Sequence, residues 1–125
     1  MPISGLPPYD PQNIFARILR GEIPCKKVFE DEWSLAFHDI NPQAPIHVLV
    51  IPKRPYCSFT DFSATAGADE IAGFMRAVGK VAKELGLEAA GYRILANMGE
   101  HGGQEVPHFH VHLFAGRLLG RMIAG

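Results

Sequence analysis

An alternation of histidine with apolar residues near the end of the chain constrains the fold more than any other feature. Residues 108–114 read His-Phe-His-Val-His-Leu-Phe. Alternate side chains of a β-strand share a face, so His108, His110 and His112 would line one side of a sheet. The apolar residues between them would point to the opposite side. That apolar side fits a sheet face packed on a hydrophobic core, so the segment predicts a strand.

The rest of the chain predicts the other elements of the sheet and its cover. Apolar and β-branched runs favour strands, whereas apolar residues at helical spacing favour helices. The first helix would begin with Asp10 as N-cap and Pro11 as first residue, and Gly21 would end it. Residues 53–66 read as irregular. The result is an α+β fold with a mainly antiparallel sheet of five strands and two helices, with strands at 27–30, 33–38, 47–51, 92–97 and 107–115 and the second helix at 69–85.

Length and composition favour one domain. A chain of 125 residues has the usual size of a single domain, and residues 1–11, rich in Pro and Gly, predict a flexible tail before a domain at 12–125. A formal net charge of -1 argues against nucleic-acid binding. No apolar run is long enough to span a bilayer and no signal peptide is evident, so we expect a cytoplasmic protein whose two cysteines stay reduced.

Three imidazoles on one strand face would repel one another if all were protonated. Some must be neutral near pH 7, and a neutral imidazole can act as nucleophile, base or metal ligand. Two alternatives stand beside a catalytic site. The first is an exposed polar face that happens to use histidine. The second is a zinc site, with a further ligand from His38, His47 or His101.

A glycine-rich loop precedes the histidine segment. Residues 97–105 read Asn-Met-Gly-Glu-His-Gly-Gly-Gln-Glu, so several backbone N–H groups have little side-chain obstruction. Such turns form concavities that suit a phosphate. Together with the histidines, the loop predicts a phosphoryl site in which backbone donors hold the phosphate while an imidazole attacks phosphorus.

The chain resembles the histidine-triad (HIT) superfamily and, within it, the Hint branch of nucleoside phosphoramidate hydrolases. The family motif, three histidines separated by single apolar residues and followed by two more apolar residues, is complete here. The resemblance covers about residues 12–118. It rests on residues 108–114, on Phe-His-Asp-Ile-Asn-Pro-Gln-Ala-Pro at 37–45, on His-Val-Leu-Val-Ile-Pro-Lys at 47–53 and on Gly-Gly-Gln at 102–104.

This resemblance implies a HIT-like fold whose sheet extends across a homodimer. The activity it implies is hydrolysis of purine nucleoside 5'-phosphoramidates, such as AMP joined to an amine, through a covalent nucleotidyl-histidine and without a cofactor. Two alternatives remain open. One is hydrolysis of dinucleoside polyphosphates, and the other is a nucleotide-binding interaction module whose catalysis is incidental.

The resemblance also implies roles for four histidines. His110 would be the nucleophile, and His112 would lie at the phosphate and assist proton transfer to the leaving amine. His47, on a neighbouring strand, would join the network that orients and polarises His110. His108 would fix the geometry by hydrogen bonding to the backbone.

Six further residues would bind the nucleotide. Asp39 would hold the ribose hydroxyls, with Ile40 against the base; a turn-former is the other reading of Asp39. The phosphate cradle would consist of Asn97, Gly103, Gln104 and the backbone near Glu105.

The chain departs from the family pattern at informative places. Some relatives bind structural zinc through Cys-x-x-Cys and a histidine, and these positions are Asn13, Ala16 and Pro55 here, so no metal is expected. Glu105 replaces a serine, and we expect its carboxylate to turn away from phosphate while its N–H serves. The end of the chain, 117–125, lacks a Trp-Pro-Pro ending that shapes substrate preference in relatives.

Overall fold

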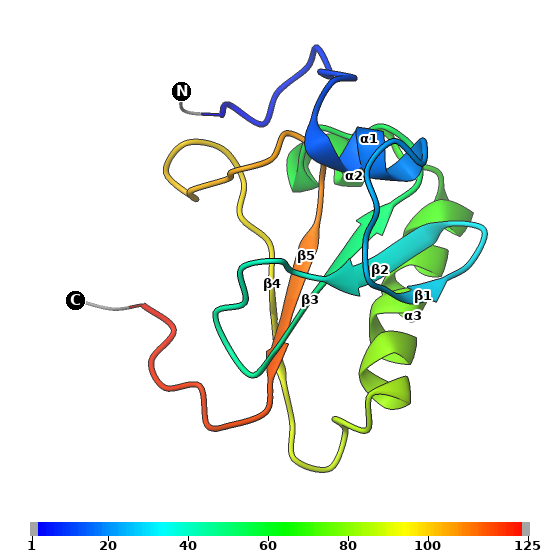
Figure 1. The fold of residues 1–125 in the computed structure, drawn as a ribbon. Coiled ribbons are helices and arrows are strands. Elements are labelled where there is room, and N and C mark those ends of the chain that lie inside the picture. Colours follow the sequence, from blue (N-terminus) through cyan, green and yellow to red (C-terminus); the bar gives the residue numbers. More distant parts are fainter. Residues whose placement is uncertain (1–2, 124–125) are drawn as a thin grey trace.

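A computed structural model describes residues 3–123 (Figure 1). Its centre is one sheet of five strands in the order β1-β2-β3-β5-β4, in which every neighbouring pair is antiparallel. The predicted α+β class and antiparallel sheet are therefore confirmed. The strands are β1 (Lys27–Glu30), β2 (Ser34–His38), β3 (Ile46–Pro52), β4 (Arg93–Leu95) and β5 (Val111–Ala115), and the helices are α1 (Ile14–Leu19), α2 (Phe59–Thr65) and α3 (Ala68–Glu84).

The prediction of two helices is wrong, because the segment predicted as irregular contains α2. Ser58 is its N-cap, and the hydroxyl accepts a hydrogen bond from the backbone N–H of Asp61 at 3.5 Å. With only 7 residues, α2 is too short to show a clear apolar period. Its buried Phe62 packs against Phe74 and Phe109, so tertiary contacts rather than local propensity stabilise it.

The first helix begins later than predicted. Asn13, and not Asp10, is the N-cap of α1, and its Oδ1 accepts from the N–H of Ala16 at 2.9 Å. Asp10 forms a turn instead, with its Oδ1 accepting from the N–H of Gln12 at 2.9 Å. Both residue types cap helices well, so composition alone could not choose between them. Gly21, with φ of +79°, lies just beyond the end of the helix, as the sequence predicted.

The histidine segment is only partly a regular strand. Strand β5 begins at Val111 rather than at position 107, because the N–H of Phe109 donates to the carbonyl of Tyr56 at 2.8 Å instead of to a strand. The alternation still holds beyond the strand, since Phe109, Val111 and Leu113 all belong to one buried cluster. The fourth strand is also shorter than predicted, three residues in place of six.

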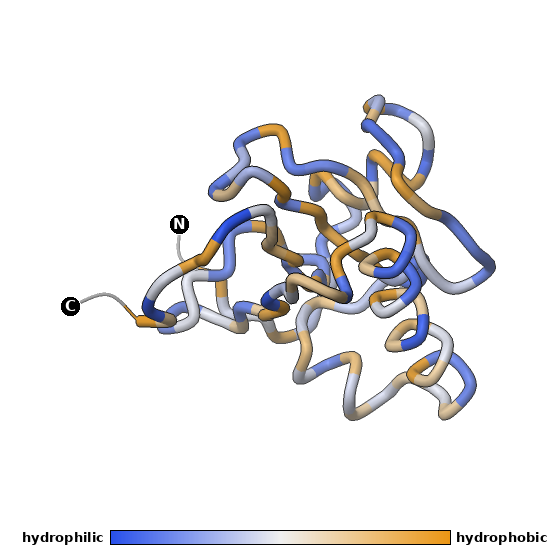
Figure 2. Tube along the Cα trace, turned by 90° about the horizontal axis from the view of Figure 1, so that it is seen from below, coloured by the Kyte–Doolittle hydropathy of each residue, from blue (hydrophilic) through white to orange (hydrophobic). Residues whose placement is uncertain are grey.

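Different elements pack on the two faces of the sheet. One face packs against α2 and α3, and hydrophobic and hydrophilic residues alternate around the coil of α3 (Figure 2). On the other face, Phe15 of α1 packs against residues of β2 and β3, namely Leu35, Phe37, Leu49 and Ile51. Helix α1 is short, so it covers only part of this second face, and the rest borders an open cleft.

The segment before α1 lies beside the loop that precedes β5 (Figure 1). The Ser58 hydroxyl donates to the carbonyl of Gly5 at 2.7 Å. Residues 1–2 of the predicted flexible tail and residues 124–125 of the predicted domain lie outside the described part of the chain. The division into tail and domain stays a prediction.

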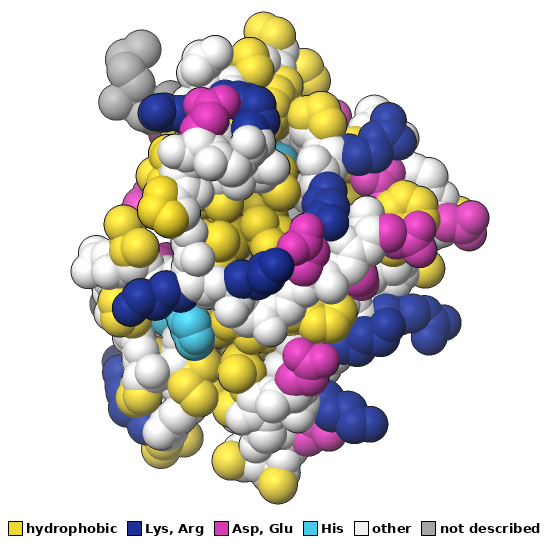
Figure 3. All heavy atoms as spheres, turned by 45° about the vertical axis from the view of Figure 1, so that its right-hand side comes forward, with side chains coloured by type: hydrophobic (Ala, Val, Ile, Leu, Met, Phe, Trp, Pro, Cys, Tyr) yellow, Lys and Arg dark blue, Asp and Glu magenta, His cyan; other side chains and the backbone are white. Residues whose placement is uncertain are grey.

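The surface carries charged side chains of both signs. On the face shown in Figure 3, basic and acidic side chains are interspersed around an apolar hollow. Among the ion pairs of the described residues, Lys27 and Lys53 both pair with Glu30, at 2.9 and 2.8 Å. Among residues 3–123, no helix combines the length and the apolar character needed to cross a bilayer.

Candidate active site

A cleft of about 480 Å³ opens on the sheet face that α1 leaves uncovered. Seven of the ten predicted site residues line it. Of the other three, His108 lies buried behind the cleft, Gln104 lies inside the adjoining loop and Ile40 lies in a neighbouring groove. The seven that line the cleft are Asp39, His47, Asn97, Gly103, Glu105, His110 and His112.

Within residues 3–123, His110 has a hydrogen-bond partner at one ring nitrogen, Nδ1, and none at the other, Nε2. Its Nδ1 lies 2.7 Å from the backbone oxygen of His108. A carbonyl only accepts, so Nδ1 carries a proton. Burial lowers the pKa of His110, which keeps the ring neutral near pH 7 and leaves an unprotonated Nε2 for the cleft. Phe15 packs edge-on against the ring, with centroids 4.9 Å apart. A neutral imidazole held in this way, with its Nε2 lone pair available, is able to act as a nucleophile.

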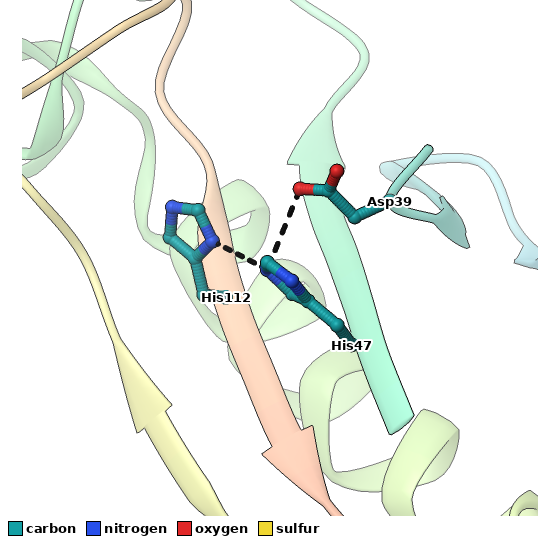
Figure 4. Close-up of side chains that lie close together, drawn as sticks. All are labelled: Asp39, His47 and His112. Carbon is teal, nitrogen blue, oxygen red and sulfur yellow. Dashed lines mark hydrogen bonds and ion pairs between the residues drawn. The ribbon is translucent and has the colours of Figure 1, made fainter. Parts of the chain in front are cut away.

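His47 and His112 form a second network with Asp39 (Figure 4). The backbone N–H of Gln43 donates to Nδ1 of His47 at 3.1 Å, so the proton of that neutral ring is on Nε2. Nε2 of His47 lies 2.9 Å from Nδ1 of His112 and 3.4 Å from Oδ2 of Asp39. His47 therefore donates to His112, whose own proton is left on Nε2. The hydrogen-bond partner of His47 in this network is thus His112, whose ring centroid lies 5.0 Å from that of His110.

Burial also decides the charge of these rings. It lowers the pKa of His112 to about 4, helped by the nearby His110 and His47, and it lowers the pKa of His47. Asp39 acts in the opposite direction on both rings. Both imidazoles of this network are thus neutral near pH 7.

His108 is fully buried and does not reach the cleft. Its Nε2 lies 2.8 Å from the carbonyl oxygen of Pro52, so Nε2 carries the proton of the neutral ring. Burial lowers the pKa of His108 to about 4. Its contacts place it behind His110 as a support, since its backbone oxygen accepts the hydrogen bond from Nδ1 of His110.

The glycine-rich loop uses many of its own donors internally. The side chain of Gln104 is fully engaged: Oε1 accepts from the N–H of Gly99 at 3.0 Å, while Nε2 donates to the carbonyls of Cys57 and Val106 at 2.7 and 3.0 Å. The N–H groups of Gly103 and Gln104 bond back to Glu100 and Gly99. Gln104 therefore shapes the loop rather than presenting its amide to a ligand. Glu105 is exposed and lines the cleft.

The predicted nucleoside contacts lie on the other side of the cleft. Oδ1 of Asp39 accepts from the N–H of Asn41 at 2.8 Å, which is the turn-forming contact. Asp39 also lines the cleft, so its remaining lone pairs can accept from a ligand. Ile40 is 94 % exposed and borders the neighbouring groove together with Asp39 and His47. Asn97 is half-buried at the far wall.

One group of residues could hold a metal ion. Asp39, His47 and His112 offer ligand atoms that all lie within 4.8 Å of one another. His38 and His101, the other histidines considered as zinc ligands, are exposed and do not belong to this group. At the positions where relatives have Cys-x-x-Cys, Asn13 caps α1 and Ala16 is buried, and neither offers a thiolate.

Of the cleft-lining residues without a predicted role, three contact histidines of the site, namely Phe15, Gln43 and Phe114. Phe114 lies parallel to His112, with centroids 5.6 Å apart and an interplanar angle of 1°. The alternation of the strand, extended by one step, could have found it. Phe15 lies on a distant helix, and Gln43 acts through its backbone N–H, so no sequence signal marks either contact.

The fold and the site define a class of small proteins in which an antiparallel α+β sheet carries a buried neutral imidazole beside a His–His–Asp network. Residues 20–119 match the family model of the HIT domain, and the chain belongs to this family. It is 67% identical over 115 residues to a 13.2 kDa HIT-like protein of Azospirillum brasilense, covering 92% of this chain and 94% of that one.

Two further similarities agree with this family assignment. The purine nucleoside phosphoramidase of Escherichia coli K12 is 44% identical over 114 residues, which span 90% of this chain and 94% of that protein. A solved HIT family hydrolase from Clostridium thermocellum superposes with a TM-score of 0.82 at 37% identity and covers 90% of this chain and 97% of its own. The expected family and HIT fold are confirmed, and relatives of this chain include hydrolases.

Proposed function

We propose that the protein hydrolyses purine nucleoside 5'-phosphoramidates through a covalent nucleotidyl intermediate on His110. The observation that carries the proposal is the hydrogen bond from His110 Nδ1 to the backbone of His108, which leaves a lone pair on Nε2 in the cleft. The phosphoramidase name of the Escherichia coli relative supports the substrate class.

The chemistry would run as two displacements at phosphorus. In the first, His110 Nε2 forms a bond to phosphorus while the phosphorus–nitrogen bond breaks, and the amine leaves with a proton from His112. An anionic phosphate in the cleft favours imidazolium, so substrate binding itself would raise the proton affinity of His112. In the second, water attacks phosphorus, His112 takes the water proton, and His110 departs as a neutral ring.

The other walls of the cleft fit a nucleoside monophosphate. Asp39 would accept from the ribose hydroxyls with the lone pairs that its turn leaves free. Ile40, the most exposed large apolar residue near the site, would pack on the base in the neighbouring groove. Gly103, the N–H of Glu105 and Asn97 would surround the phosphate, with Gln104 holding the loop in shape.

The experiment is turnover of a substrate panel by the purified protein. AMP and GMP amidates with ammonia and lysine as leaving groups are compared with diadenosine polyphosphates, and a covalent adduct is trapped by acid quench and mapped by mass spectrometry. We expect amidates to turn over fastest and the adduct to lie on His110. Faster cleavage of diadenosine polyphosphates would replace the proposed substrate class, and tight AMP binding without turnover of any substrate would identify a binding module.

We further propose that two copies pair through β4, so that one sheet runs across a homodimer. Strand β4 is an edge of the sheet and leaves Tyr92, Ile94 and Leu95 between 36% and 44% exposed. Sedimentation should give twice the chain mass of 13.7 kDa. Ile94→Lys should shift it toward the monomer, whereas Met75→Lys, on the exposed side of α3, should not. A monomeric wild-type protein would contradict the proposal.

A further inference from the structure

A tyrosine from the segment before α1 reaches the back of the site. The hydroxyl oxygen of Tyr9 lies 2.7 Å from Nδ1 of His108, although 99 positions separate them in the sequence. The two rings meet edge-on, with centroids 5.7 Å apart. Tyr9 does not line the cleft, so any effect it has on chemistry must pass through His108.

The direction of this hydrogen bond follows from the other nitrogen of the ring. His108 Nε2 donates to the carbonyl of Pro52, so Nδ1 of the neutral ring can only accept. The Tyr9 hydroxyl is therefore the donor. Burial raises the pKa of Tyr9 and lowers the pKa of His108, so both groups are in the required state at neutral pH. Every polar atom of the buried His108 ring then has a partner.

His108 connects this contact to the nucleophile. Its backbone oxygen is the acceptor for His110 Nδ1 at 2.7 Å. A ring of His108 held at both nitrogens restrains the backbone that carries this oxygen. The oxygen in turn determines which nitrogen of His110 is protonated and where Nε2 points.

We propose that Tyr9 is a positioning residue for His110, because its hydroxyl holds the His108 ring and thereby the carbonyl that orients the nucleophile. The proposal rests on the proposed role of His110 as nucleophile. It gives the N-terminal segment a part in the site that the histidine motif alone does not contain.

The segment is anchored on both sides of Tyr9. On one side, Asn13 caps α1. On the other, the carbonyl of Gly5 accepts from Ser58, and Gly5 packs so closely on the glycine-rich loop that a Cβ there would lie 2.8 Å from Oε1 of Gln104 and 3.2 Å from the nitrogen of Gly99. Gly5 also has a φ of +73°, a conformation that favours glycine. Tyr9 thus arrives from a fixed direction.

The test compares two tyrosine variants that each lose one hydroxyl. Tyr9→Phe removes the donor to His108, whereas Tyr56→Phe removes a buried donor to Oε1 of Glu70, 2.6 Å away and outside the cleft. We expect Tyr9→Phe to lower kcat for an AMP amidate by about 3- to 10-fold with KM nearly unchanged, the size of one hydrogen bond. Tyr56→Phe should lower thermal stability and leave kcat of the folded protein unchanged.

Ring-nitrogen NMR separates this proposal from the proposed function, because it requires no substrate. In Tyr9→Phe the Nδ1 resonance of His108 should move toward that of a free, unprotonated nitrogen, and the His110 resonances should broaden or shift. In Tyr56→Phe both should stay in place. An unmoved His108 resonance, a wild-type kcat in Tyr9→Phe, or an equal loss of kcat in Tyr56→Phe would each overturn the role of Tyr9. Failure of the wild-type protein to cleave amidates would instead overturn the proposed function.

Discussion

The two faces of β3 and β5 share one backbone and differ in almost everything else. Toward α3, Val48, Val50 and Leu113 are fully buried among apolar side chains. Toward the cleft, His47 and His112 occupy the intervening positions and bond to each other. A single step along a strand therefore moves from a residue buried in the apolar core to one that lines the cleft. Substitutions at adjacent positions should separate stability from activity.

The largest effect is expected on the cleft face. His110→Ala should lower turnover by several orders of magnitude, because the covalent path through Nε2 is lost, while nucleotide binding and the fold remain. Single-turnover kinetics with an AMP amidate and calorimetric titration with AMP measure the two properties. Retention of about a tenth of wild-type turnover would remove His110 from the role of nucleophile.

The matching change on the α3 face should have the opposite profile. Leu113→Ala should lower the free energy of unfolding by about 2–5 kcal/mol, because it leaves a cavity at a position with no exposure. Turnover per folded molecule should stay close to wild type. Urea unfolding and an assay at low temperature measure both. A fall in turnover comparable to that of His110→Ala would show that the two faces are not independent.

Asp39 tests how far the cleft face extends beyond the reacting atoms. Asp39→Ala should weaken AMP binding by about 10–100-fold, taking one charge-assisted hydrogen bond as lost. The effect should appear mainly in KM, since ribose binds alike in ground and transition states. Titration with AMP and 2'-deoxy-AMP decides it. If the variant still prefers the ribonucleotide as strongly as wild type, Asp39 serves only the turn with Asn41.

Acid should lower stability through the buried histidines of the cleft side. In the folded protein burial lowers the pKa of His108 and of His112 to about 4, below their ordinary value of 6.5. Between these two pH values the unfolded chain binds more protons at His108 and His112 than the folded chain does. The contribution of these two rings to the free energy of unfolding therefore falls as pH falls from 6.5 toward 4, and it is constant above 6.5. For His108 alone we expect a loss of about 1–2 kcal/mol between pH 6.5 and 5. Urea unfolding that gives equal stability at pH 5 and 7 would contradict this assignment.

The smallest expected effect is that of chelation. Asn13 and Ala16 offer no thiolate at the positions where the family resemblance implies zinc-binding cysteines in some relatives, so exhaustive chelation should leave turnover and stability unchanged. Elemental analysis of the untreated protein is the companion measurement. About one zinc per chain, with activity lost on its removal, would point to the Asp39, His47 and His112 group as a metal centre.

The sequence predicts the sheet well and the connections less well. The apolar run at 47–51 predicts a strand, and the alternation at 108–114 also predicts which face of a strand is buried. The structure places Phe109, Val111 and Leu113 together as expected. Helix α2 depends on tertiary contacts, which a local sequence pattern does not contain. The N-cap Asn13 was missed because Asp10 is an equally good capping residue by type.

The same limit applies inside the site. Residue types predict which side chains gather at the cleft, and seven of ten do. Side-chain roles at Gln104 and His47 follow instead from partners far away in sequence, such as Cys57 and His112. Tyr9 and His108 are 99 positions apart in the sequence, and no local pattern around Tyr9 predicts their contact.

The protonation pattern of the site has a consequence for how the protein can change over generations. Three of the hydrogen bonds that determine it involve main-chain atoms, namely the N–H of Gln43 and the carbonyls of Pro52 and His108. Codons 43 and 52 can therefore mutate without altering those two partners, provided that the path of the backbone survives and position 43 keeps its N–H. Retention of the reactive tautomer then depends on the backbone conformation more than on which amino acids occupy these two positions.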